Sequence, residues 1–227
     1  MREIILDTET TGLSPANGDK IVEIGCVELI NHLPTGNCFQ KFLNPERDIP
    51  EEAIRIHGLT REFLKDKPVF SEIAEDFLEF IGDDTLIIHN ADFDIKFLNA
   101  ELAKAGFKPI LMNRVIDTLA LARKKFPGVP TSLDALCRRF NIDNSDRSLH
   151  GALLDSKLLA AVYLELIGGR QTGLELGQKL NEGPNIQTKV NGDKNFHPPR
   201  PHAPSQEELE AHTAFIRNFK NPLWLQD

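Results

Sequence analysis

Residues 3–12 read EIILDTETTG, and this stretch decides how the rest of the chain is interpreted. The apolar residues 4–6 are followed at once by polar ones, a pattern typical of a short buried strand. Asp7 and Glu9 come at the end of that strand with spacing i, i+2, which places both carboxylates on one face. Two adjacent carboxylates repel each other unless a cation lies between them. A solvated surface pair is the alternative, but a pair that ends an apolar strand favours a function.

The segments that follow predict an α/β domain. Residues 20–30 and 38–43 are strand candidates, joined by turns that contain Gly, Asn and Pro. Three successive strands with short connections predict an antiparallel meander, and strand–helix alternation then predicts a five-stranded mixed sheet. The remaining predicted elements are strands at 85–89 and 114–117 and helices at 71–81, 94–105, 118–125, 133–140 and 151–167.

Composition places the chain among ordinary globular proteins. It has 227 residues, of which 41% are hydrophobic and 26% are charged. No stretch of 18 uncharged apolar residues is present, so an ordinary transmembrane helix is excluded. The N-terminal sequence MREIILDTET has no apolar core of the kind that a secretory signal needs, so we expect a cytoplasmic protein without membrane attachment. The three cysteines lack metal-ligand spacing, and Cys26 and Cys137 fit core positions.

The net charge restricts how the chain could handle a polyanion. Lysine and arginine number 26 against 34 aspartate and glutamate residues, a net charge of −8. An acidic protein does not hold nucleic acid by a general basic surface. If it acts on nucleic acid, it needs metal ions, a local site, or a tether to another protein that holds the substrate.

Two further groups carry acidic side chains at positions where strands give way to helices. Asp94 follows the fourth predicted strand in HNADFD, where a first-turn residue favoured by the helix dipole is the alternative reading. His150 and Asp155 form an H-x4-D pair at the start of the last helix. Asp155 falls on the apolar face of that helix and therefore needs a partner. The alternative is that His150 caps the helix and that Asp155 pairs with an arginine.

Taken together, these groups predict a metal site. The α/β order lets Asp7, Glu9, Asp94 and Asp155 converge, and oxygen ligands of this kind suit Mg²⁺ or Mn²⁺. Two such cations would clamp the attacking and leaving oxygens of an in-line phosphoryl displacement. A nearby histidine could accept the proton of the attacking water near neutral pH.

The same motifs carry a resemblance to a known family. D-x-E at a strand end, N-x-x-F-D and H-x4-D together resemble the proofreading 3′–5′ exonucleases that use four acidic residues and a histidine. LDTETTGL, IHGLT, IHNADFDIKF, FPGVPTSLDALCRRFNID and LHGALLDSKLLAAVYLELIGG are similar to the epsilon-subunit family of bacterial DNA polymerase III, over residues 3–176. The resemblance implies a ribonuclease-H-like fold, two metal ions on the four carboxylates, and His150 as general base.

The resemblance also implies contacts with substrate. Glu52 and His57 match positions that contact the terminal nucleotide, although a turn carboxylate and a helix-end histidine are the readings that the residues alone favour. Asp117 reads as a helix cap rather than as a metal ligand. The full set of implied substrate contacts is Thr8, Glu9, Thr10, Thr11, Glu52, His57 and Asp155.

The C-terminal part predicts a tether. We divide the chain into an exonuclease domain (1–170), a clamp-binding peptide with a flexible linker (171–204) and a polymerase-docking segment (205–227). Residues 183–204 contain five prolines and little apolar content. This linker departs from the family pattern in being shortened and in containing proline. The linker would keep the exonuclease at a high effective concentration near DNA held by its partners.

Both ends of the tether carry apolar anchors. QTGLEL, residues 171–176, resembles the peptide by which replication proteins bind the sliding clamp. SQEELEAHTAFIRNF predicts an amphipathic helix with a capping box of Ser205 and Glu208. The resemblance implies that this helix and the end of the chain bind the polymerase alpha subunit. The expected anchors are Gln171, Leu174 and Leu176 for the clamp and Phe215, Phe219 and Trp224 for the polymerase.

The sequence therefore predicts an exonuclease that removes mispaired 3′ nucleotides from DNA as the proofreading subunit of a replicase. An RNA-directed exonuclease of the same family is the nearest alternative, and the replicase-like tail argues against it. A noncatalytic scaffold between polymerase and clamp is the alternative from another class. Four converging carboxylates argue against that reading, because an inert scaffold has no use for them.

Overall fold

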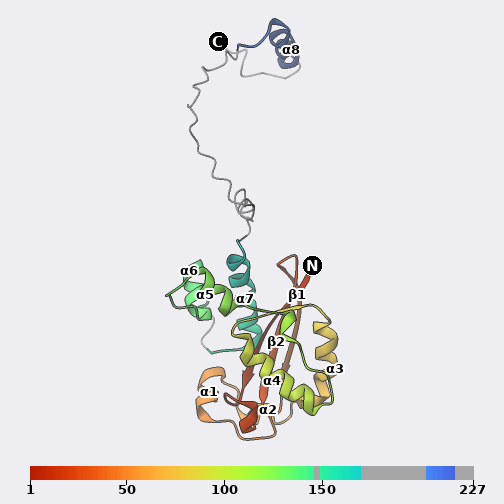
Figure 1. The fold of residues 1–227 in the computed structure, drawn as a ribbon, viewed down its shortest axis with the longest axis vertical. Coiled ribbons are helices and arrows are strands. Elements are labelled where there is room, and N and C mark those ends of the chain that lie inside the picture. The colour runs from red at the N-terminus through yellow and green to blue at the C-terminus, as the bar shows by residue number, and fades with distance from the viewer. Residues whose placement is uncertain (146–148, 170–202, 218–227) are drawn as a thin grey trace, which may run out of the picture. The chain divides into compact units, whose positions relative to one another are not determined.

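The computed structural model describes residues 1–145, 149–169 and 203–217, which fall into two separate parts. The first part is built on a five-stranded sheet with strand order β3-β2-β1-β4-β5 (Figure 1). Its middle strand, β1 (Arg2–Thr10), pairs antiparallel with β2 (Ile21–Ile30) and parallel with β4 (Thr85–Ile88). The outer strands are β3 (Leu33–Phe42) and β5 (Val115–Asp117). The predicted mixed sheet and its meander are confirmed.

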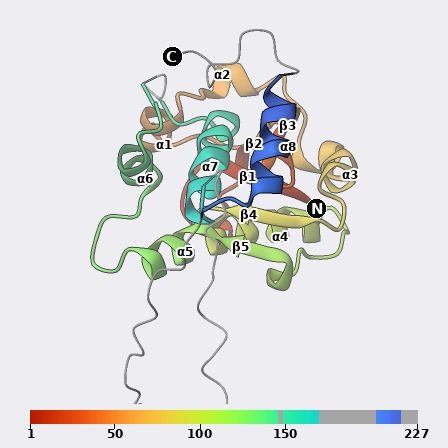
Figure 2. The same ribbon diagram turned by 90° about the horizontal axis from the view of Figure 1, so that it is seen from above.

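Helices cover both faces of the sheet (Figure 2). α3 (Phe70–Ile81) and α4 (Ala91–Lys104) pack on one face. The opposite face carries α5 (Thr118–Lys125), α6 (Leu133–Phe140) and α7 (Ala152–Leu166). None of the helices in the described part of the chain is long and apolar enough to cross a bilayer.

The alternation of side chains along β1 assigns its residues to two cores. Ile4 and Leu6 point into the core beneath α3 and α4, and Ile5 points into the core beneath α7. All three are fully buried, as expected for a central strand covered on both faces. The residues that follow continue the same alternation, which decides where Asp7, Thr8 and Glu9 point.

Three segments differ from the sequence prediction. The short helices α1 (Glu51–His57) and α2 (Arg61–Leu64) lie in a stretch to which no element was assigned, because they are too short to show an apolar period. β3 begins five residues earlier than predicted, since its first six residues are exposed at the sheet edge and carry no buried alternation. α4 likewise begins three residues before the predicted start, after Asn90 in a left-handed conformation.

The second described part is α8 (Gln206–Ile216), which begins where the capping box predicted. The Ser205 hydroxyl accepts from the Glu208 N–H at 3.2 Å, and the Glu208 carboxylate accepts from the Ser205 N–H at 2.8 Å. Phe215 is 61% exposed on this helix. The other predicted anchors lie outside the described residues: Gln171, Leu174, Leu176, Phe219 and Trp224.

Candidate active site

The candidate site forms where β1 extends past its parallel neighbour. β4 pairs with β1 only from Glu3 to Ile5, whereas β1 continues to Thr10 beside β2. Beyond Ile88 the chain leaves the sheet and enters α4. This leaves one edge of the last residues of β1 open to side chains from the helix that follows β4.

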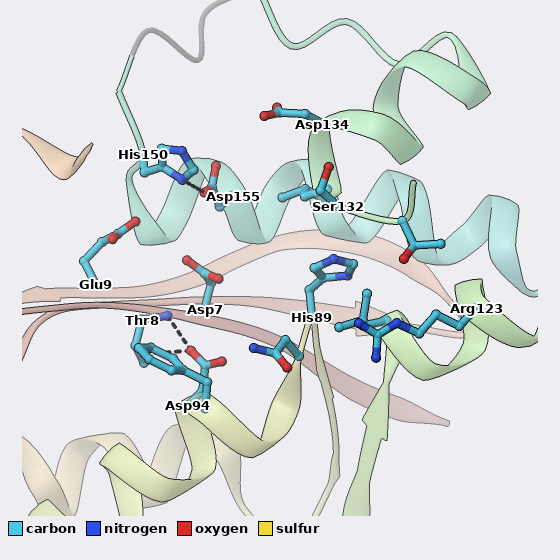
Figure 3. Close-up of a pocket in the computed structure, with 15 residues that line it drawn as sticks. Asp7, Thr8, Glu9, His89, Asp94, Arg123, Ser132, Asp134, His150 and Asp155 are labelled. Atoms are coloured by element: carbon cyan, nitrogen blue, oxygen red, sulfur yellow. Dashed lines mark hydrogen bonds and ion pairs between the residues drawn. The ribbon is translucent and has the colours of Figure 1, made fainter. Parts of the chain in front are cut away.

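Asp94 enters this opening from the first turn of α4 (Figure 3). Its Oδ1 accepts from the backbone N–H of Thr8 at 3.0 Å and from the Thr8 hydroxyl at 2.7 Å. The carboxylate thus takes the place of the backbone acceptor that a longer β4 would supply. Thr8 lies on the α4 face of β1, whereas its neighbours Asp7 and Glu9 lie on the α7 face with Ile5.

Asp155 is brought to the site by close packing of α7 on β2. The Glu23 carboxylate accepts from the Ala152 N–H at 3.1 Å, and the Ser156 hydroxyl donates to the Gly25 carbonyl at 2.9 Å. A Cβ added at Gly25 would lie 2.3 Å from the backbone of Ala152, so only glycine fits beneath the first turn of α7. Asp155 is 3% exposed there.

His150 immediately precedes α7 and is held at its backbone by α1. Its N–H donates to the Ile56 carbonyl at 2.9 Å. The Nδ1 atom lies 3.3 Å from Oδ2 of Asp155, and the side chain is 46% exposed. The imidazole therefore reaches both the carboxylate and solvent. Glu9, His150 and Asp155 each offer a ligand atom within 4.8 Å of the others.

One cavity of about 570 Å³ is lined by all the predicted metal ligands and the predicted base. Asp7, Glu9, Asp94, His150 and Asp155 line it, as the sequence analysis predicted for a converging set. The alternative in which His150 caps the helix is not realised, since Gly151 is the N-cap of α7, and His150 is instead an ion-pair partner of Asp155. The other lining residues are Thr8, His89, Asn90, Phe93, Leu119, Arg123, Thr131, Ser132, Leu133 and Asp134.

The electrostatics of the cavity favour a bound cation. Burial raises the pKa of the Asp94 carboxyl to about 7, against hydrogen bonds from Thr8 that lower it, and the charge of Asp117 adds to the rise. The cluster holds carboxylates and an imidazole but no thiolate. This donor set suits hard divalent cations such as Mg²⁺ and Mn²⁺.

The remaining predicted substrate residues lie outside the cavity lining. The Thr10 hydroxyl donates to the Gly12 carbonyl at 2.6 Å, and the Thr11 hydroxyl accepts from the Lys20 N–H at 3.0 Å. Both threonines are thus hydrogen-bonded within the loop after β1. Glu52 is exposed on α1.

His57, at the end of α1, is buried. Its Nδ1 accepts from the Leu59 N–H at 3.0 Å, while Nε2 has no hydrogen-bond partner among the described residues. Burial lowers the pKa of this imidazole against the Thr10 backbone, which raises it, and the charge of the nearby His150 adds to the lowering. A neutral ring that accepts at Nδ1 carries its proton at Nε2, so His57 keeps one donor to offer.

Sequence reasoning missed several residues of the cavity. It gave no hydrogen-bond role to Thr8 toward Asp94, and it did not single out Arg123 or Asp134. Their only signal would have been the prediction that α5 and α6 border the site. Asp117 does cap α5, as predicted: its carboxylate accepts from the Leu119 N–H at 2.8 Å.

Known proteins resemble this chain in sequence and in fold. The profile of the Exonuclease family matches residues 4–163. The DNA polymerase III subunit epsilon of Rickettsia felis is 53% identical over 222 residues, covering 96% of this chain and 97% of the relative. Exonuclease X, solved in complex with 5′-overhanging duplex DNA, is 30% identical with a TM-score of 0.58, covering 73% of this chain and 90% of that one.

A further solved structure supports the fold alone. The nuclease domain of 3′hExo, a DEDDh family member bound to rAMP, is 23% identical with a TM-score of 0.62. The alignment covers 73% of this chain and 91% of that domain. The chain belongs to the Exonuclease family and, within it, to the epsilon subunits of DNA polymerase III.

Proposed function

We propose that this exonuclease removes mispaired 3′-terminal nucleotides from DNA one at a time, releasing 5′-monophosphates, as the proofreading subunit of a replicase. The observation that carries the proposal is the convergence of four carboxylates and a histidine on one cavity in a member of the epsilon family. The residues are Asp7, Glu9, Asp94, His150 and Asp155.

Two Mg²⁺ or Mn²⁺ ions fit this donor set, with Asp7, Glu9, Asp94 and Asp155 as the residues that would hold them directly or through water. The raised pKa of Asp94 supports the fit, because a bound cation would offset the burial that opposes ionisation of this carboxyl. When bound, the ions would neutralise the carboxylates and stabilise the charge that develops on the phosphate.

His150 is proposed as the general base. The Asp155 carboxylate, 3.3 Å from Nδ1, orients the imidazole and leaves Nε2 to accept the proton of the attacking water. Because the side chain is half exposed, the proton can pass from the ring to solvent after each turnover.

The terminal nucleotide is proposed to lie beside α1, the helix whose end adjoins His150. The buried Nε2–H of His57 is a donor for it, and Glu52 on the same helix is a second contact. Glu9 and Asp155 would contact it as well as the metals, with Thr8, Thr10 and Thr11 near its sugar and phosphate. Unpaired ends should be preferred, because a mismatched end costs less to separate than a paired one.

The tail is proposed to hold the enzyme at the replication site in the cytoplasm. Gln171, Leu174 and Leu176 would bind the sliding clamp. Phe215, Phe219 and Trp224 would bind the polymerase alpha subunit, and the exposure of Phe215 on α8 supports this. Such tethering supplies the DNA that an acidic protein does not gather by its own charge.

The proposal is tested with single-stranded DNA labelled at its 5′ end and an RNA of the same sequence. Incubation with Mg²⁺ or Mn²⁺ should shorten the DNA from its 3′ end. EDTA should abolish this shortening, and the Asp7→Ala variant should not show it. Faster shortening of the RNA would favour the RNA-directed alternative. Intact DNA with both metals, in folded wild-type protein, would favour the noncatalytic scaffold.

A further inference from the structure

The region of α5 and α6 reverses the charge of the rest of the chain. Residues 118–140 carry five basic side chains and one acidic one, in a protein whose net charge is −8. An accumulation of positive charge beside the cavity is therefore a local feature. Its basic residues are Arg123, Lys124, Lys125, Arg138 and Arg139.

Two of these cations have structural partners. The Lys125 ammonium donates to the carbonyls of Glu165 and Leu166, at 3.2 and 3.0 Å, and so caps the end of α7. The Arg139 guanidinium lies 4.5 Å from the centre of the Phe126 ring. Contacts within the folded protein therefore explain the positions of these two side chains.

Arg123 differs because it lines the cavity that contains the carboxylates. In the described ranges, 1–145, 149–169 and 203–217, its guanidinium forms no hydrogen bond and no ion pair. Figure 3 shows the side chain reaching toward His89, on the side of the cavity away from Glu9 and His150. Asp134 lies across the cavity, where it accepts from the Asn144 amide at 3.1 Å. The carboxylates that are the predicted metal ligands thus mark an acidic end of the cavity, and Arg123 marks a basic end on the opposite side.

If the proposed function holds, the bound strand also has two different ends, a terminal nucleoside on one side of the cleaved bond and a further phosphate on the other. The bond to be broken joins the terminal nucleoside, beside α1, to the rest of the strand at the carboxylate cluster. The next phosphate along the strand must lie on the far side of that bond from the terminal nucleoside. Arg123 is on that side, opposite His150 (Figure 3).

We propose that Arg123 binds the phosphate next to the scissile one and so forms a second phosphate subsite. The proposal rests on the proposed function, since it takes the carboxylate cluster as the place of cleavage. A guanidinium suits this role because its planar donors bind phosphate oxygens in pairs and it always carries its charge. Such a contact positions the strand without reading its sequence.

The test compares Arg123→Gln with Lys124→Gln, a matched control that removes the same charge from the neighbouring residue outside the cavity lining. Each is assayed on a single-stranded oligonucleotide and on the p-nitrophenyl ester of thymidine 5′-monophosphate, which has no second phosphate. On the oligonucleotide, Arg123→Gln should raise KM about tenfold and reduce the slope of log affinity against log salt by about 0.7. Lys124→Gln should change KM less than about twofold.

The ester separates the subsite from the cleavage site. Arg123→Gln should hydrolyse the ester at the wild-type rate, which also shows that the variant is folded and holds its metals. Arg123→Lys, which keeps the charge but loses the paired geometry, should recover part of the oligonucleotide affinity. An oligonucleotide KM and salt slope in Arg123→Gln equal to those of Lys124→Gln would overturn the subsite alone. Failure of the wild type on both substrates would overturn the proposed function, and the subsite with it.

Discussion

β1 buries acidic side chains at both of its ends, on the same face and beneath the same helix, yet the two ends are built differently. At the first end Glu3 is fully buried. The Tyr163 hydroxyl of α7 donates to its Oε1 at 2.8 Å, and Nδ1 of His32 lies 2.7 Å from its Oε2. Each oxygen of this carboxylate has a partner of its own.

At the other end carboxylates gather. Asp7 and Glu9 share a cavity with Asp155 beneath the first turn of α7, and Asp94 enters from the opposite helix. The raised pKa of Asp94 shows that ionisation is opposed there. Burial alone therefore does not distinguish a structural acid from a metal ligand. The distinction lies in how many acids share one place: Glu3 is a single carboxylate with a partner on each oxygen, whereas several carboxylates line one cavity at the candidate active site.

The largest expected effect is the loss of activity in Asp155→Asn. Loss of one charged ligand should lower the rate on single-stranded DNA with Mg²⁺ at least about a thousandfold, because several kcal/mol of transition-state stabilisation depend on the cations. The rate of 3′ shortening measures it. Glu3→Gln is the matched control, since it removes a buried acid from the other end of β1. Equal losses in the two variants would break the comparison.

The next effect is that of His150→Gln, which should slow hydrolysis by about a hundredfold. The rate of the wild type should rise with pH, because a general base must be unprotonated to accept a proton, and the variant should lose that rise. Single-turnover rates from pH 5.5 to 8.5 would check both statements. A pH profile of unchanged shape in the variant would remove His150 from the role of base.

A third prediction concerns stability without metal. Asp94 has a pKa of about 7 in the native protein against an ordinary 3.8, so between these values the native state holds a proton that the unfolded chain has lost. Its contribution to native stability should therefore decrease as pH rises from about 4 to 7. In EDTA, the Tm of Asp94→Asn should fall less than the Tm of the wild type when the pH is raised from 5 to 8. Mg²⁺ should raise Tm at pH 8 more in the wild type.

Thermal unfolding at both pH values, with EDTA or Mg²⁺, gives the four numbers needed for each protein. The same pH dependence of Tm in wild type and Asp94→Asn would show that ionisation of this carboxyl does not cause the loss of stability without metal.

The smallest effect is expected at the structural end of β1. Tyr163→Phe removes the hydroxyl that donates to Glu3 and leaves a buried carboxylate oxygen without that donor. The free energy of unfolding should fall by about 1.5–3 kcal/mol, with DNA hydrolysis per folded molecule unchanged. Urea unfolding measures the free energy of unfolding, and the DNA-shortening assay measures hydrolysis per folded molecule. A loss of activity greater than the loss of folded protein would connect the two ends of β1.

The sequence predicted the parts of this site that follow from periodicity. The i, i+2 spacing of Asp7 and Glu9 placed both on one face, and the apolar run before them identified the central strand. Asp94 and Asp155 were placed by the order of strands and helices together with the family resemblance. What brings Asp155 close, the glycine beneath α7 at position 25, was not anticipated, because a close backbone approach leaves no pattern in one sequence.

Other features depend on contacts between distant segments. The bonds from Thr8 to Asp94 span 86 residues, and the bond from Tyr163 to Glu3 spans 160. Helix α1, which holds the backbone of His150, is too short and polar for an apolar period. The basic end of the cavity was not anticipated either, since Arg123 reads as one of three cations in the last turn of α5.

Binding of Mn²⁺, counted by electron paramagnetic resonance during titration of the metal-free protein, tests the central claim most directly. The account predicts two ions per chain in the wild type, loss of binding in Asp7→Asn, and wild-type binding in Glu3→Gln. Unchanged binding in Asp7→Asn, or equal loss in both variants, would contradict the claim that the carboxylates at this end of β1 form the metal site.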